Sequence, residues 1–139
     1  PEPADVLRRL LDDIGLPQGL GVNFDPANLV MVCREDIPRA VETLGPYIVH
    51  THAKDGVNLQ PVDAEVLYGA FAGDRPEGFT SSDYIREVPL GEGDVDFPSW
   101  VASLRQAGFD GYLTVEREAG DNPRADIAQA VGFLRELIG

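Results

Sequence analysis

One stretch decides the fold and holds the first candidates for a functional site: Tyr47-Ile48-Val49-His50-Thr51-His52-Ala53-Lys54-Asp55. Its first residues favour a β-strand, and it contains both histidines of the chain. Because side chains alternate along a strand, His50 and His52 leave it on the same face. A strand that ends in an imidazole, a lysine and an aspartate is unusual if packing is its whole role. We therefore predict a strand from Tyr47 to about Ala53, with functional side chains near its carboxyl end.

Two further strands are predicted, one before and one after this stretch. The runs from Leu20 to Phe24 and from Gly111 to Val115 are short and mostly apolar, as strands covered on both faces are. Apolar residues at helical spacing, with capping residues and prolines at the starts, predict four helices: 4–14, 36–44, one after Asp96 and one from Asn122-Pro123. Strands separated by helices indicate an α/β fold with parallel strands and right-handed crossovers.

The region from Asp55 to Leu90 breaks this alternation. It is longer than a usual connection in an α/β unit, and glycines and prolines are mixed with scattered aromatic residues. We interpret about 56–90 as an insertion folded over one end of the sheet, a candidate lid. No linker is visible, so the 139 residues are predicted to form a single domain.

Composition excludes several classes of partner. A hydrophobic content of 43% is typical of a folded globular protein, and no apolar run is long enough to span a membrane. A net charge of −13 disfavours nucleic acids and anionic membranes, because both would be repelled. Cys33 is the sole cysteine, so an intrachain disulfide is impossible and a reducing, cytoplasmic setting is predicted.

Three candidate ligands stand where the predicted strands end: Asp25, His52 and Glu116. Ligands of parallel α/β folds bind at the carboxyl ends of strands, and two carboxylates with an imidazole suit a divalent metal. Each residue has an alternative interpretation. Asp25 before Pro26 could be a turn residue, His52 a packed core histidine, and Glu116 part of a surface ion pair. Their shared position favours the metal site.

Three neighbouring side chains are weaker candidates. His50 lies on the face of His52 but one layer deeper, which favours structural support or a contact beside the ligands. Lys54 and Arg117 follow strand ends and could meet a polar or anionic substrate, although a solvated loop lysine or a surface arginine is the commoner case.

Four motifs, taken in order, resemble a known family: Val22-Asn23-Phe24-Asp25-Pro26-Ala27-Asn28-Leu29, Val49-His50-Thr51-His52-Ala53-Lys54-Asp55, Val88-Pro89-Leu90-Gly91-Glu92-Gly93-Asp94-Val95-Asp96-Phe97 and Gly108-Phe109-Asp110-Gly111-Tyr112-Leu113-Thr114-Val115-Glu116. The chain is similar, over nearly its whole length, to the sugar phosphate isomerase/epimerase family of the xylose-isomerase-like TIM-barrel superfamily. The resemblance implies a (β/α)8 barrel, of which this chain holds about three parallel strands with their helices. It also implies one divalent metal ion (Mn, Co, Mg or Zn) at the carboxyl ends of the strands.

The resemblance assigns roles to particular residues. Asp25, His52 and Glu116 would be the last three of four metal ligands, and Glu116 would also be the catalytic acid/base that moves a substrate proton through an enediolate. Family members often carry a substrate-contacting histidine three residues after the ligand aspartate. Asn28 stands there in this chain, so it is expected to contact a sugar or polyol substrate without shuttling a proton. Substrate contacts are also predicted for three further residues: His50, Lys54 and Arg117.

The first ligand, a glutamate, would lie upstream of Pro1. We therefore expect the chain to be the C-terminal portion of a longer barrel protein, inactive alone, or to be completed by another chain in a homo-oligomer or swapped dimer. Three functions remain open at this stage. They are a metal-dependent sugar or sugar phosphate isomerase/epimerase, an inosose-type dehydratase, and a non-catalytic truncated barrel that acts as an interaction module.

Overall fold

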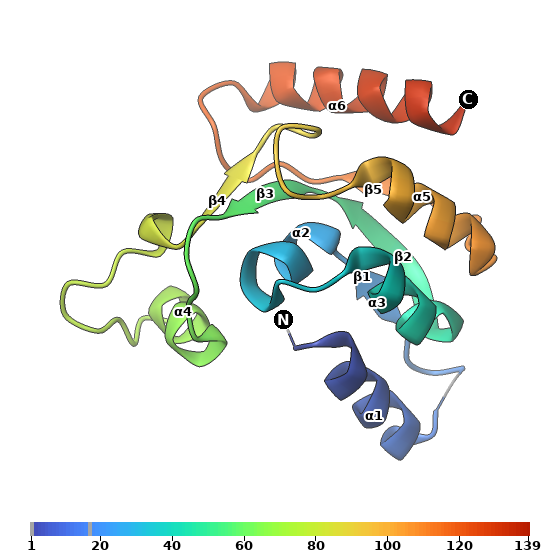
Figure 1. Cartoon of the computed structure of the whole chain (residues 1–139), viewed down its shortest axis with the longest axis horizontal. Helices are drawn as coiled ribbons and strands as arrows, with labels where there is room; N and C mark the ends of the chain where they lie inside the picture. The colour runs from blue at the N-terminus through green and yellow to red at the C-terminus, as the bar shows by residue number, and fades with distance from the viewer. Residues whose placement is uncertain (1, 17) are drawn as a thin grey trace.

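The computed structural model describes residues 2–16 and 18–139 and shows an α/β fold around a three-stranded parallel sheet (Figure 1). The strands are β1 (Val22–Phe24), β2 (Ile48–Ala53) and β5 (Leu113–Val115), in the spatial order β1-β2-β5. The quoted stretch thus forms the central strand. Asn23 of β1 lies opposite His50, and Thr114 of β5 lies opposite His52. The predicted class, part of a parallel α/β barrel, is confirmed.

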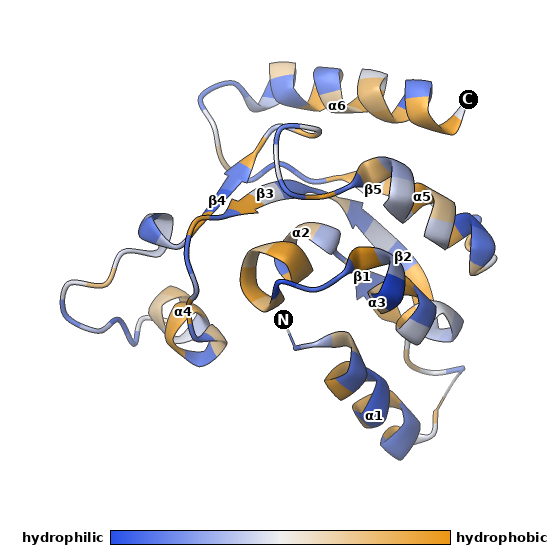
Figure 2. Cartoon of the chain, in the orientation of Figure 1, coloured by the Kyte–Doolittle hydropathy of each residue, from blue (hydrophilic) through white to orange (hydrophobic). Residues whose placement is uncertain are grey.

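Four helices form a layer on one face of this sheet: α1 (Ala4–Ile14), α3 (Ile37–Leu44), α5 (Phe97–Gln106) and α6 (Pro123–Ile138). Helix α3 packs between α1 and α5, and the rings of Phe97 and Phe133 join α5 to α6 with centroids 5.5 Å apart. Figure 2 shows hydrophobic and hydrophilic residues interleaved along these helices, as amphipathic helices require. The largest fully buried side chains of the core include Phe24 of β1 and, from the helices, Val41, Leu44, Phe97 and Trp100.

The helices begin where their capping residues predict. The carboxylates of Asp36 and Asp96 and the side-chain oxygen of Asn122 each accept a hydrogen bond from the backbone three residues later, at 2.9, 3.1 and 3.3 Å. Helix α1 ends at Gly15, whose φ of 65° is one that glycine adopts easily. Local sequence therefore fixes these boundaries. No helix in the described part of the chain is long and apolar enough to cross a membrane.

The other face of the sheet and both of its edges are open. Val49 in β2 is 69% exposed, and Tyr112, just before β5, is 83% exposed. Within residues 2–16 and 18–139, the outer edges of β1 and β5 pair with no further strand, so the barrel is not closed.

The region interpreted as an irregular insertion contains regular structure. Strand β3 (Asp55–Asn58) pairs antiparallel with β4 (Ile85–Val88), and helix α4 (Ala64–Phe71) and a short 3-10 turn (Ser81–Asp83) lie between them. Helix α4 and the loop after it extend away from the helix layer, at the left of Figure 1. The sequence Asp55-Gly56-Val57-Asn58 has no apolar alternation, so β3 gave no strand signal.

Smaller departures occur near β1 and β5. These strands begin at Val22 and Leu113, each two residues later than predicted, and both end where predicted. The connection after β1 is a turn of helix, α2 (Pro26–Asn28), followed by a π-helical segment (Leu29–Cys33). A 3-10 turn (Gly45–Tyr47) leads into β2.

Asp55 fastens the β3–β4 hairpin to the chain that follows it. Its side chain is almost fully buried, and its oxygens accept hydrogen bonds from four backbone N–H groups: Gly56 (2.8 Å), Gly91 (2.9 Å), Gly93 (2.9 Å) and Val95 (3.2 Å). Burial raises the pKa of Asp55, and these four bonds offset only part of that rise. Asp55 is therefore a structural residue that holds the hairpin over the strand ends.

Candidate metal centre

The carboxyl ends of the three parallel strands bring together Asp25, His52 and Glu116. One ligand atom from each lies within 4.8 Å of the others, and all three side chains are partly buried. The predicted convergence of these residues is thus present. Two ligands on opposite sides of a metal ion are about 4 Å apart, so small side-chain rotations would bring all three into coordination distance. Two carboxylates and an imidazole fit Mn²⁺, Co²⁺ or Zn²⁺ better than ions that prefer all-oxygen sites.

Asp25 is held in place by Asn28. Asp25 caps helix α2, and its carboxylate accepts the backbone N–H of Asn28 at 3.1 Å and the side-chain amide of Asn28 at 2.6 Å. Burial raises the pKa of Asp25, although the bond from the Asn28 backbone opposes this rise. Asn28, predicted to contact substrate, also lines the cavity described below. It orients a candidate ligand as well.

His52 is fixed at both ring nitrogens. Its Nδ1 lies 3.0 Å from Glu116 Oε2, and its Nε2 lies 3.1 Å from the side-chain amide nitrogen of Asn23. Asn23 was not among the predicted site residues. Side-chain alternation could have identified it, because Asn23 is two residues before Asp25 and so lies on the same face of the strand.

Lys54 lies beside the candidate ligands and contacts three carboxylates. Its Nζ is 3.3 Å from Glu116 Oε2 and 3.6 Å from Glu87 Oε2, and it also donates to Glu118. Burial lowers the pKa of Lys54, but the bond to Glu118 and the charge of Glu116 more than offset this and hold the pKa above its usual range. Lys54 is therefore a fixed positive charge next to the candidate centre.

A cavity of about 790 Å³ opens above these residues. The strand ends supply Asn23, Asp25, His52 and Glu116, and the hairpin region supplies the opposite wall, including Tyr68, Ser81 and Glu87. The insertion predicted as a lid thus forms part of the cavity wall. This volume is within the range of small-molecule sites.

Two of the predicted substrate contacts lie outside this cavity. His50 lies two residues before His52 on β2, and its Nε2 is 3.1 Å from Oγ1 of Thr114, the residue opposite His52 in the sheet. Arg117 is 6% exposed and bonds to Glu87 at 2.7 Å and to Asp126 at 2.8 Å. Both side chains have partners within the chain: His50 lies below His52 on the same face of β2, and Arg117 is held by two carboxylates.

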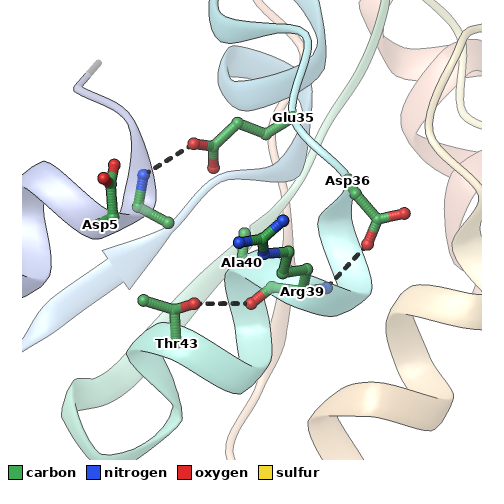
Figure 3. A pocket seen from close by; sticks show the side chains of 7 residues that line it. Asp5, Glu35, Asp36, Arg39, Ala40 and Thr43 are labelled. Atoms are coloured by element: carbon green, nitrogen blue, oxygen red, sulfur yellow. Dashed lines mark hydrogen bonds between the residues drawn. The ribbon is translucent and has the colours of Figure 1, made fainter.

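A second hollow, of about 300 Å³, lies between α1 and α3 (Figure 3). Its polar groups bond within its own wall: Glu35 accepts the N–H of Ala4 at 3.0 Å, and Asp36 accepts that of Arg39 at 2.9 Å. We interpret this hollow as the boundary between two packed helices.

Parallel strands with covering helices, and a carboxylate–imidazole–carboxylate set at their carboxyl ends, define a barrel-type α/β protein with a candidate mononuclear metal site. The family described as xylose isomerase-like TIM barrel matches residues 3–137, and the chain belongs to it. The family predicted from the motifs is thereby confirmed.

Three proteins illustrate what the chain is similar to. L-ribulose-5-phosphate 3-epimerase UlaE of Salmonella paratyphi C is 42% identical over 58 residues, which span 40% of this chain and 20% of that protein. The rhizopine catabolism protein MocC of Rhizobium meliloti is 40% identical over 75 residues, 54% of this chain and 21% of that protein. A xylose isomerase domain protein from Planctomyces limnophilus matches with a TM-score of 0.74 and 29% identity, over 98% of this chain and 43% of that chain. The chain thus spans less than half the length of these relatives.

Proposed function

We propose that this chain supplies the metal-binding strand ends of a metal-dependent sugar isomerase or epimerase. The observation that carries the proposal is the convergence of Asp25, His52 and Glu116 within 4.8 Å, at the base of a cavity of about 790 Å³. Membership in the xylose isomerase-like family and the similarity to a sugar epimerase support it. A cytoplasmic setting stays a prediction.

When bound, a divalent ion would polarise the carbonyl and hydroxyl oxygens of a sugar. Asp25 and His52 would hold that ion, and their partners Asn28 and Asn23 would keep both side chains oriented.

Glu116 is the candidate acid/base. Its carboxylate is 28% exposed and is oriented by His52 at 3.0 Å and Lys54 at 3.3 Å. It would accept a proton from the carbon next to the substrate carbonyl and return that proton to the carbonyl carbon. The proton of the adjacent hydroxyl passes to the former carbonyl oxygen, and the two transfers together interconvert an aldose and a ketose. Epimerisation would need a second acid/base group on the other face of the substrate.

The two histidines provide a matched test of the metal site. We expect His52→Ala to weaken Mn²⁺ binding by more than about 100-fold, because ligand loss exceeds the effect of losing an outer partner. His50→Ala should leave the affinity nearly unchanged. Titration calorimetry measures both, and circular dichroism checks that each variant is folded. Unchanged affinity in His52→Ala would remove the basis of the proposal.

The reaction is tested on the metal-loaded protein, by incubating linear ketoses and cyclic polyols in D₂O and identifying the products. An isomerase or epimerase incorporates solvent deuterium and conserves the mass of the skeleton. Loss of water from a cyclic polyol would establish the dehydratase alternative instead.

A further inference from the structure

One carboxylate beside the cavity occupies a complete anion-binding site. Glu87, on β4, is 10% exposed, and its Oε1 accepts hydrogen bonds from Arg117 Nη1 at 2.7 Å, Glu118 N at 2.9 Å and Ala119 N at 3.1 Å. Its Oε2 lies 3.6 Å from Lys54 Nζ. None of these contacts was anticipated from the sequence, because Glu87 lies 30 or more positions from each of these partners.

The groups around Glu87 are those that proteins use to bind phosphate. A guanidinium, an ammonium and two adjacent backbone N–H groups converge on one anionic group. The two N–H groups follow β5, and loops after the last strands are where barrel enzymes commonly bind a substrate phosphate. In this chain a protein carboxylate fills that position.

Two cations belong to the described residues of the cavity wall, Lys54 and Arg86. Lys54 contacts Glu116 and Glu118 as well as Glu87. Arg86, next to Glu87 on β4, also lines the cavity, but it is not one of the donors that contact Glu87.

The charges that line the cavity also disfavour a phosphate group. Four carboxylates line it (Asp25, Glu87, Glu116 and Glu118), and they are balanced by Lys54, Arg86 and the two charges that a divalent ion would bring, which leaves no positive charge in excess. A phosphate ester would add up to two further negative charges.

We propose that the substrate of this site is an unphosphorylated sugar or polyol, and that Glu87 occupies the place where a substrate phosphate would bind. This inference rests on the proposed function for the cavity itself, but the state of the anion site can be measured without any turnover.

Removing Glu87 should open the anion site. We expect Glu87→Ala to bind inorganic phosphate saturably, seen as shifts of the Glu118 and Ala119 amide signals in ¹⁵N NMR of the metal-free protein. Wild type should bind at least about tenfold more weakly. Glu77→Ala is the matched control, because it removes the same charge from an exposed loop and should behave as wild type. Arg117 and Lys54 keep other carboxylate partners in Glu87→Ala, which favours a folded variant.

Glu87→Gln provides a second variant of nearly native size and should show a smaller gain in the same direction. Equal phosphate binding by wild type and the Glu87 variants would overturn the proposal, as would the absence of any gain in both folded variants.

The substrate class is tested with metal-loaded wild type and the pair L-ribulose and L-ribulose 5-phosphate. We expect the free ketose to shift the cavity amides at lower concentration than its phosphate. Tighter binding of the phosphate would overturn the inference and leave the proposed function standing. If neither sugar binds, the proposed function fails, whereas a gain of phosphate binding in Glu87→Ala would still assign Glu87 to the anion site.

Discussion

Asn23 orients the imidazole of His52. Its side-chain amide nitrogen lies 3.1 Å from Nε2, so the ring turns Nδ1 toward Glu116, 3.0 Å away. Each of the three candidate ligands thus has an orienting partner: Asn28 for Asp25, Asn23 for His52 and Lys54 for Glu116. Replacing such a partner commonly lowers metal affinity by about 10–100-fold.

Replacing Asn23 should therefore weaken metal binding without removing a ligand. We expect Asn23→Ala to lower Mn²⁺ affinity by about tenfold, measured by titration calorimetry. Thr114→Ala serves as the control, because it removes the equivalent partner of His50, which lies away from the cavity. A loss of affinity as large in Thr114→Ala would mean that loosening of the sheet, and not ring orientation, causes the effect.

Glu87 should also make stability depend on pH. Burial raises the pKa of Glu87, but the bonds from Arg117 and the two backbone N–H groups outweigh it, so the pKa lies below its ordinary value of 4.5. The unfolded chain therefore binds more protons here, and this contribution to stability is lost as pH falls below about 4.5.

The test compares urea unfolding of wild type and Glu87→Gln between about pH 6 and about pH 3.5. We expect the free energy difference between them to shrink as pH falls. A constant difference would show that Glu87 stabilises the fold through packing alone.

The three candidate ligands could be predicted from sequence because each ends a strand, and parallel strands end at one edge. Asn23 was predictable in principle by alternation. Glu87 was not, because its partners become neighbours only when the β3–β4 hairpin folds back over the segment after β5.

At the scale of elements, the hairpin depends on the fit between Asp55 and a glycine-rich turn. A Cβ on Gly93 would lie 2.2 Å from Asp55 Oδ1 and 2.7 Å from the Gly56 backbone oxygen, which is too close for either contact. The helices were predicted well because their caps and periodicity are local. Strand β3 was missed because its own sequence pattern does not indicate a strand. It is held in place by the buried side chain of Asp55, whose backbone partners lie far along the chain.

Two glycine substitutions should have opposite effects. Gly93→Ala should lower the free energy of unfolding by about 1–3 kcal/mol, because the backbone must shift around the new methyl group. Gly132→Ala, in α6, meets nothing within 4 Å and should raise it by about 0.5–1 kcal/mol, because alanine favours the helix. Urea denaturation measures both. A neutral Gly93→Ala would show that the turn can move away from Asp55.

For the whole molecule, the sheet is the incomplete part of an otherwise packed structure. Its class was predictable because alternating strands and helices leave few topologies open. What completes the sheet was not predictable, and association with another chain remains a prediction.

Hydrogen exchange tests the open edges. Strand β2 pairs on both sides, whereas β1 and β5 each pair on one side within the described residues. At low protein concentration we expect β2 amides to exchange most slowly and β1 and β5 amides markedly faster. Protection of β1 and β5 that grows with concentration would reveal self-association, and edge strands as protected as β2 at every concentration would contradict the open sheet.

The pairing of β2 with β5 has a consequence for folding during synthesis. Thr51 donates to the carbonyl of Tyr112, 61 positions later in the chain, at 2.9 Å. Closing so long a loop is slow compared with forming a helix. Helices α1 and α3 can therefore form during synthesis, whereas the three-stranded sheet cannot be completed before β5 has been made. Glu116 follows that last strand. A ribosome-bound chain would therefore have no assembled metal centre until nearly all of these residues have emerged, which delays any capture of a metal ion until the fold is almost complete.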